Sequence, residues 1–267
     1  MHVRFWGTRG SIAVSGIRFT RTGGCTSCVE VEHDGARLIL DGGTGLRALG
    51  EDLGCAPIDA TVLFSHVHWD HIQGVPFFLP AYHPAARLTF AGATRDRCDV
   101  RDALSAQMRA PSFPVTLDVL RAELRFRTVT SGQPFEVGPF RITPLDVDHP
   151  GGTLAYRVEA GGRILVYATD VELAGTLPVG FVDLCEGADL LLHDAQYTAA
   201  EYPTRRGWGH STWEDAIAVG RAAGVRRLGL FHHDPARDDD AVAVIEARAR
   251  ETWAPTFAAR DGTRMSL

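Results

Sequence analysis

The 267-residue chain contains no lysine and no asparagine, so all 27 of its basic side chains are arginines. Without a lysine amine the protein cannot form a Schiff base with a carbonyl substrate. Without asparagine it cannot use that side-chain amide to stabilise an oxyanion. The chain does carry 11 histidines and 33 acidic residues. Catalysis or metal binding by this chain would therefore have to rely mainly on histidine and carboxylate side chains.

Long apolar runs, a basic excess and a regular cysteine pattern are also missing. No apolar stretch approaches the length of a membrane span, and the first residues lack a signal-peptide pattern. The net charge of -6 makes long nucleic acid an improbable partner. Only one CxxC pair occurs among the scattered cysteines, which are Cys25, Cys28, Cys55, Cys98 and Cys185. We expect a cytoplasmic protein with reduced thiols and no membrane partner.

Apolar alternation and glycine-rich turns predict two series of strands with helices between and after them. The first series is expected at 2–6, 28–33, 37–41, 61–65 and 88–91, and the second at 126–130, 140–147, 154–159, 163–168, 190–193 and 228–232. Helices are expected at 46–53, 71–79, 94–108, 211–223 and 239–252, with Ser211 and Glu214 as a capping box. This order favours one domain, 1–267, in which two sheets pack together with helices outside.

Four metal-binding side chains fall within six positions, in His66-Val67-His68-Trp69-Asp70-His71. Imidazole and carboxylate are ligands that zinc and similar divalent metals prefer. Alternation at a strand end can direct His66 and His68 the same way, while Asp70 and His71 turn onto the next element. One ion cannot easily take all four side chains from so short a loop, whereas two adjacent ions can. The motif therefore predicts a dinuclear metallohydrolase.

Three further candidates follow singly, each at a strand end or in a turn: His149, Asp170 and His232. Loop tips held by rigid strands often carry catalytic groups. Taken alone, a histidine at such a place is more often a hydrogen-bonded structural residue than a ligand, so both interpretations stay open for each. Arg9, in an early turn, is interpreted as solvated, with steering of a phosphate as the alternative.

Together these motifs resemble the metallo-β-lactamase fold superfamily and, within it, the ribonuclease Z-like phosphodiesterase branch. The resemblance rests on His66-x-His68-x-Asp70-His71 followed in order by His149, Asp170 and His232. The early loops Gly7-Thr8-Arg9-Gly10-Ser11 and Leu40-Asp41-Gly42-Gly43-Thr44-Gly45, and the later Gly209-His210-Ser211-Thr212, are also similar. The resemblance implies an α/β, four-layer αββα sandwich with two mixed β-sheets flanked by helices.

The resemblance also implies two divalent metal ions per chain, zinc first, with manganese and iron as alternatives. One ion would be held by His66, His68 and His149, the other by Asp70, His71 and His232, with Asp170 bridging both. Asp70 and Asp170 would thus take part in catalysis together with His210, which would stabilise the transition state or protonate the leaving group. Trp208 and Trp213 beside it leave open a packed corner instead. Asp41, Asp148 and Asp194 are expected to support the histidines.

The expected function is cleavage of small, including cyclic, nucleotide phosphodiesters by attack of a metal-bridging hydroxide. Transfer-RNA processing is disfavoured, because only 21 positions separate His149 from Asp170, where bacterial members of the branch carry a long arm. Segment 97–124 is interpreted as a lid over the metals or as a packing insert. Alternatives are a lactone or thioester hydrolase with the same metal pair, and a metal-sensing module without turnover. A homodimer is compatible with the sequence.

Overall fold

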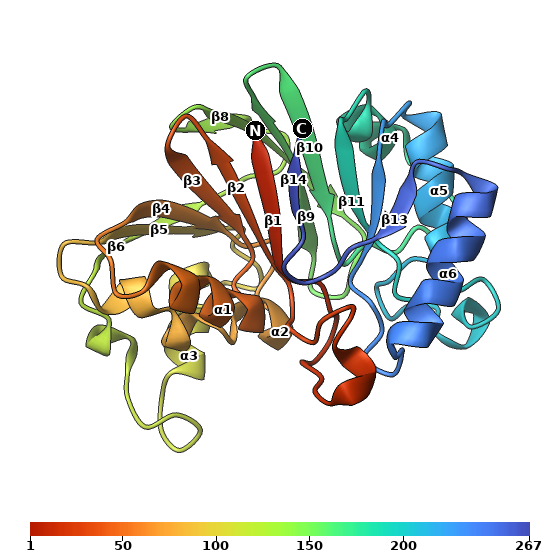
Figure 1. Ribbon diagram of the computed structural model, residues 1–267. Helices are drawn as coiled ribbons and strands as arrows, with labels where there is room; N and C mark the ends of the chain where they lie inside the picture. The colour runs from red at the N-terminus through yellow and green to blue at the C-terminus, as the bar shows by residue number, and fades with distance from the viewer.

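The computed structural model describes residues 1–267 as two seven-stranded sheets packed face to face, with helices on the two outer faces (Figure 1). The strand orders are β14-β1-β2-β3-β4-β5-β6 and β13-β12-β11-β10-β9-β8-β7. Helices α1 and α3 cover the first sheet, whereas α4, α5 and α6 cover the second. The predicted αββα sandwich is therefore confirmed.

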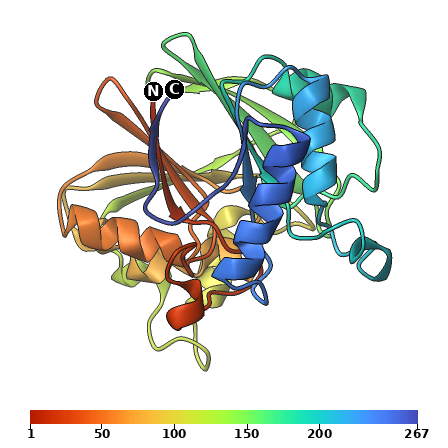
Figure 2. The same ribbon diagram turned by 45° about the vertical axis from the view of Figure 1, so that its right-hand side comes forward.

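The first sheet contains β1 (His2–Gly7), β2 (Cys28–His33), β3 (Ala36–Leu40), β4 (Asp59–Leu63), β5 (Arg87–Gly92), β6 (Glu123–Thr128) and β14 (Arg264–Ser266). The second contains β7 (Phe135–Val137), β8 (Phe140–Val147), β9 (Thr153–Ala160), β10 (Arg163–Ala168), β11 (Leu190–Asp194), β12 (Leu228–Phe231) and β13 (Thr256–Ala258). The α-helices are α1 (Thr44–Leu53), α2 (Trp69–Ile72), α3 (Val100–Gln107), α4 (Val179–Cys185), α5 (Trp213–Ala222) and α6 (Asp239–Thr252). The two termini lie side by side, because β14 pairs antiparallel with β1 (Figure 2).

Central strands are apolar on both faces because each sheet lies between the other sheet and a helical layer. In β3, Leu38 and Leu40 enter the core between the sheets, while Ile39 packs under the helices of the first sheet. In β10, Leu165 and Tyr167 face the same central core and the alternate residues pack against α4 and α5. The period of two along a strand thus fills both interfaces.

Several predicted elements end where the sequence indicated, namely 28–33, 140–147, 163–168 and 239–252. The helix predicted at 94–108 begins only at Val100. Asp96 and Arg97 adopt positive φ angles in a tight turn that bridges Arg95 and Cys98, and Asp99 then caps the helix. The capping box predicted at Ser211 lies one residue later, on Thr212 and Asp215. The helix predicted at 71–79 is shorter, since α2 ends at Ile72 and a 3-10 turn follows. Helix α4 and the edge strands β7, β13 and β14 were not predicted.

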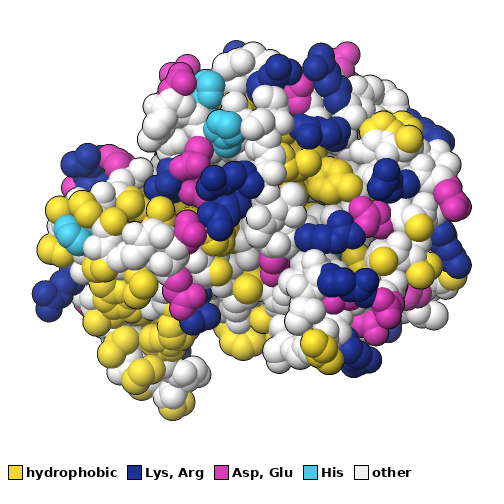
Figure 3. All heavy atoms as spheres, viewed as in Figure 1, with side chains coloured by type: hydrophobic (Ala, Val, Ile, Leu, Met, Phe, Trp, Pro, Cys, Tyr) yellow, Lys and Arg dark blue, Asp and Glu magenta, His cyan; other side chains and the backbone are white.

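The segment 97–124 packs on the outer face of the first sheet. Leu104, Met108 and Leu117 join the apolar cluster beneath it. Hydrophobic side chains gather at the lower left of Figure 3, the side on which α3 and its following loop lie in Figure 1. Exposed apolar residues of this segment include Val115 and Val119. At these positions the segment packs against the first sheet.

Two further expectations concern the whole chain. All five cysteines are free, as expected for reduced thiols. None of the helices combines the length and apolar character that crossing a bilayer would require.

Candidate metal centre

The predicted metal ligands meet at one edge of the sandwich, where strands of both sheets end. His66, His68, Asp70 and His71 follow β4 of the first sheet. Three loops of the second sheet bring the others, with His149 after β8, Asp170 after β10 and His232 after β12. Strands β10, β11 and β12 are parallel neighbours, so their carboxyl ends lie together. The sheet topology therefore brings the segment from His66 to His71 together with three side chains that lie far from it in the sequence.

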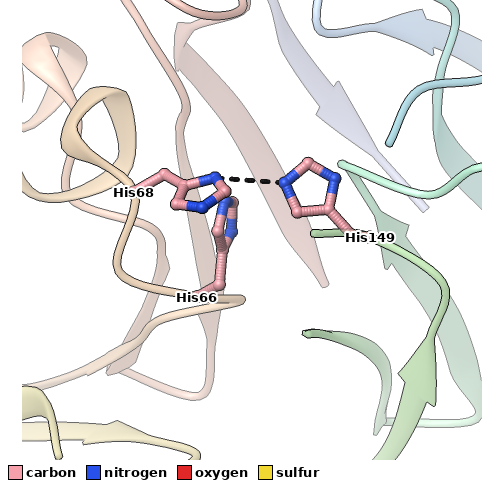
Figure 4. Close-up of side chains that lie close together, drawn as sticks. All are labelled: His66, His68 and His149. Atoms are coloured by element: carbon pink, nitrogen blue, oxygen red, sulfur yellow. Dashed lines mark hydrogen bonds between the residues drawn. The ribbon is translucent and has the colours of Figure 1, made fainter. Parts of the chain in front are cut away.

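His66, His68 and His149 form the first group, and Figure 4 shows their rings turned toward one another. Their nearest ring nitrogens all lie within 4.8 Å of one another, and His149 Nε2 is 3.1 Å from His68 Nδ1. His66 and His149 are buried, whereas His68 is exposed because its ring forms part of the wall of a surface hollow. Three imidazole nitrogens at this spacing suit one divalent metal.

Asp70, His71 and His232 form the second group. Asp70 Oδ2 lies 3.3 Å from both His71 Nε2 and His232 Nε2. The same carboxylate oxygen accepts the backbone N–H of Ser11 at 2.7 Å, which ties the early loop to the site. Next to Ser11, a Cβ on Gly10 would come within 2.4 Å of His232 Nδ1, so the backbone can approach this histidine only without a side chain.

Asp170 lies between the two groups. Its Oδ2 is 3.2 Å from both His71 Nε2 and His232 Nε2. Its Oδ1 faces the first group, 3.9 Å from His66 Nε2 and 3.8 Å from His149 Nε2. The residue is buried and has a φ of 54°, a conformation that side chains such as Asp and Asn tolerate best. One carboxylate oxygen thus points to each group.

The donor set fits divalent metal ions. His66 Nε2 and His71 Nε2 are buried and have no hydrogen-bond partner, although buried polar atoms are almost always paired. Burial lowers the pKa of His66, His68 and His149, which keeps these rings neutral and able to coordinate. Around His71, the carboxylates of Asp70 and Asp170 outweigh burial and raise the pKa of the ring. That pocket favours positive charge, which a dication supplies as well as a proton does.

The second nitrogen of each buried ligand histidine has a partner that fixes the ring. His66 Nδ1 lies 3.1 Å from Ser65 Oγ and His71 Nδ1 lies 2.8 Å from Asp41 Oδ2. His149 Nδ1 donates to Gly209 O at 2.7 Å, and His232 Nδ1 lies 3.0 Å from Gln196 Oε1. Asp41 also accepts the hydroxyl of Tyr167 at 2.8 Å. Of these partners only Asp41 was predicted; Ser65 borders the motif, but nothing in the sequence marks Tyr167 or Gln196.

Two other expectations, for Asp148 and Arg9, have different outcomes. Asp148 is exposed and its carboxylate makes no hydrogen bond to a histidine, so the structure gives its predicted supporting role no basis. Arg9 is fully buried and donates to Gly23 O and Arg237 O, so it is a structural tie and not a solvated or phosphate-steering residue. His233 is buried and its Nε2 lies 2.9 Å from Ala259 O, away from the ligand groups.

His210 and Asp194 form a pair beside Asp170. His210 Nδ1 lies 2.7 Å from Asp194 Oδ2, as the proposed orienting role of Asp194 requires. Burial opposes charge on this ring, but Asp194 outweighs it and raises the pKa of His210 to about 9. A protonated imidazole here can donate a hydrogen bond or a proton to a substrate oxygen. Trp213 is buried at the start of α5, whereas Trp208 is 57% exposed.

The cluster opens into a hollow of about 270 Å³. Its lining consists of Ser11, His68, Asp70, His149, Pro150, Asp170, Trp208, His210 and His232. No residue of segment 97–124 contributes to this lining. A second cavity of about 190 Å³ shares His68 with this hollow, and its mixed polar and apolar lining includes His66, Arg95, Asp96, Cys98 and Val100.

Comparison with known proteins agrees with this geometry. Residues 36–233 match the family model described as the beta-lactamase superfamily domain. The ribonuclease Z of Lactococcus lactis subsp. cremoris is 35% identical over 248 residues, covering 75% of this chain and 79% of that protein. The metallo-beta-lactamase fold protein YhfI from Bacillus subtilis superimposes with a TM-score of 0.75 at 21% identity, covering 99% and 98% of the two chains.

The short form of human tRNase Z shares the fold as well, with a TM-score of 0.70, 20% identity and coverage of 100% and 99%. The family match spans all seven clustered side chains, since they fall between residues 66 and 232. The chain belongs to the metallo-β-lactamase superfamily, in its ribonuclease Z-like branch, and is a metal-dependent hydrolase.

Proposed function

We propose that the protein is a dinuclear phosphodiesterase acting on small nucleotide phosphodiesters. The observation that supports the proposal is that the other six predicted ligands form two groups on either side of Asp170, with one carboxylate oxygen of Asp170 facing each group. Two ions held side by side suit an in-line displacement at phosphorus. Zinc is the first choice for the metal, and manganese or iron accept the same nitrogen and oxygen donors.

The ions, when bound, would lower the pKa of coordinated water and offset the charge on a phosphoryl group. The protein's own side chains would position the substrate and donate the proton. His210 uses Nδ1 to donate to Asp194, so its Nε2 is left to donate to an oxygen of the substrate. Asp194 also accepts the backbone N–H of Asp170 at 3.1 Å, so the same carboxylate positions the shared ligand. His210 is therefore assigned to protonation of the leaving group or to stabilisation of the transition state.

Small substrates are favoured by the segment between His149 and Asp170. It consists of the hairpin β9–β10 alone, with no room for the long arm expected of bacterial transfer-RNA processing members. The net charge of -6 also gives little general attraction for a polyanion. Transfer-RNA processing is the second candidate, because the curated relative from Lactococcus lactis is a ribonuclease Z.

A substrate panel tests the proposal. Zinc- or manganese-loaded protein is given bis-p-nitrophenyl phosphate, a set of lactones and thioesters, and a precursor transfer RNA with a 3′ extension. We expect the highest kcat/KM for the small phosphodiester. A higher kcat/KM for lactones or thioesters would replace the proposed reaction, and efficient 3′ processing of the precursor would replace the proposed substrate size. Metal analysis should give two ions per chain, and a single ion at saturation would contradict the dinuclear site.

A further inference from the structure

Trp208 is an exposed aromatic residue in the lining of the metal hollow. Burial of indole surface is favourable, so a tryptophan left 57% exposed at an active site lacks a packing explanation. A flat ring at this place offers a surface on which another flat ring can stack. The other exposed tryptophan near the metals, Trp69, is 61% exposed but lines neither this hollow nor the adjoining cavity.

The turn that carries Trp208 is held rigidly. Gly207 and Gly209 adopt φ angles of 81° and 85°, and both of their backbone N–H groups donate to the carboxylate of Glu172 at 2.7 Å. Tyr202 donates its hydroxyl to the same carboxylate. A mobile surface loop would not show so many fixed contacts, so the exposed position of Trp208 is built into the fold.

The same turn is also joined to the metal centre. Gly209 O accepts the hydrogen bond from His149 Nδ1 at 2.7 Å, and a Cβ on Gly209 would come within 2.2 Å of that nitrogen. The turn therefore packs directly on a ligand of the first group, and His210 follows it in the sequence. A substrate phosphate near His149 and His210 would have its adjacent substituent within reach of the indole.

Arg205, itself exposed, lies over the Trp208 ring. Its guanidinium carbon lies 4.7 Å from the centroid of the Trp208 ring, a cation–π distance that helps to fix the orientation of the indole. The chain around Trp208 thus supplies a fixed, partly supported aromatic surface next to a site for a charged phosphate.

We infer that Trp208 is a stacking platform for a nucleobase carried by the substituent next to the scissile phosphate. This inference rests on the proposed function and sharpens it, since it makes a base-bearing phosphodiester the preferred substrate class. Stacking does not depend on the hydrogen-bonding edge of a base, so purines and pyrimidines should both bind, with purines stronger because of their larger ring area.

Binding of two ligands that differ only in the base tests the inference. Calorimetric titration of zinc-loaded protein compares adenosine 5′-monophosphate with ribose 5-phosphate, in the wild type and in Trp208→Ala, Trp208→Phe and Trp69→Ala. We expect Trp208→Ala to raise the Kd of the nucleotide by about 5- to 150-fold and leave that of ribose 5-phosphate within about twofold. Trp208→Phe should restore most of the affinity, and the matched surface variant Trp69→Ala should keep both values.

Two outcomes would overturn the platform. Equal weakening of both ligands in Trp208→Ala would mean that the indole only supports the turn or the metal ligands, and wild-type protein that does not favour the nucleotide would remove the base subsite altogether. Hydrolysis of bis-p-nitrophenyl phosphate by the wild type is measured alongside. If the wild type binds the nucleotide more tightly than ribose 5-phosphate but does not hydrolyse the phosphodiester, only the proposed function is contradicted. If it hydrolyses the phosphodiester but binds both ligands equally well, only the stacking platform is contradicted.

Discussion

The two halves of the molecule build the metal centre in different ways. The first half supplies four predicted ligands from one six-residue segment after β4, whereas the second supplies three predicted ligands from three separate loops. A contiguous segment depends mainly on its own conformation. Separate loops depend on the order and register of the strands that carry them, here the parallel neighbours β10, β11 and β12. In the second half, the order and direction of the strands therefore determine where the three predicted ligands lie.

The two halves are alike in how they support the histidines. Asp41 in the first half and Asp194 in the second are fully buried, and each accepts four hydrogen bonds. Asp41 holds a predicted ligand, His71, whereas Asp194 holds His210, whose ligand atom also lies within 4.8 Å of those of Asp170 and His232. Under the proposed function, Asp41 would support a metal ligand, and Asp194 would support both the shared ligand Asp170 and the reacting His210.

Asp170 joins the halves, so its substitution should have the largest effect. Asp170→Asn keeps the shape and tolerates the φ of 54°, but removes the charge that faces both groups. We expect turnover to fall by more than the roughly 10- to 100-fold typical of supporting carboxylates, and metal content to fall below two ions per chain. Elemental analysis and bis-p-nitrophenyl phosphate turnover measure this.

Asp189→Asn is the matched control for that substitution. Asp189 is buried just before β11, and its carboxylate accepts from Ile164 N and Arg163 and pairs with Arg226, away from the predicted ligands. The control should keep both ions and full activity. If Asp170→Asn behaves like Asp189→Asn, then Asp170 does not connect the two groups.

Substitution of the supporting carboxylates Asp41 and Asp194 should have smaller effects than substitution of Asp170, and the effects should differ between the two halves. Asp41→Asn is expected to weaken metal affinity by about 10- to 100-fold, because the ring of His71 loses its charged partner. Asp194→Asn should instead lower kcat by about 100-fold or more with both ions retained, because His210 loses the charge that keeps it protonated. Competition with a metal chelator and steady-state kinetics measure the two effects. Similar losses of metal in both variants would argue against the division of labour.

The sequence predicted the two halves unequally well for the same physical reason. The segment from His66 to His71 could be identified alone, since its ligands are close in sequence. His149, Asp170 and His232 were placed through family resemblance, because no local signal separates such residues from structural ones. The role of Tyr167 was not predicted. Its hydroxyl donates to Asp41 across the core between the two sheets, and the sequence of one strand does not show which residue of the other sheet it will contact.

Local turn contacts explain why the start of α3 and the cap of α5 differ from the prediction. The start of α3 was placed too early because Asp96 and Arg97 adopt positive φ angles that residues other than glycine seldom take. At α5, Ser211 and Thr212 are both good capping residues, and only the contacts decide between them. Asp215 accepts from Thr212, while the Ser211 hydroxyl donates to Val171 O.

The capping residues Asp99 of α3 and Thr212 of α5 give the smallest expected difference between the halves. Thr212→Ala and Asp99→Ala each remove one side-chain cap, worth about 1 kcal/mol, so each should lower the Tm by about 2–4 °C in calorimetry. Only Thr212→Ala should also lower kcat, because α5 begins just after His210 whereas α3 lies outside the hollow. If Asp99→Ala lowered kcat as much, the segment around α3 would have to act on the reaction after all, as a lid would.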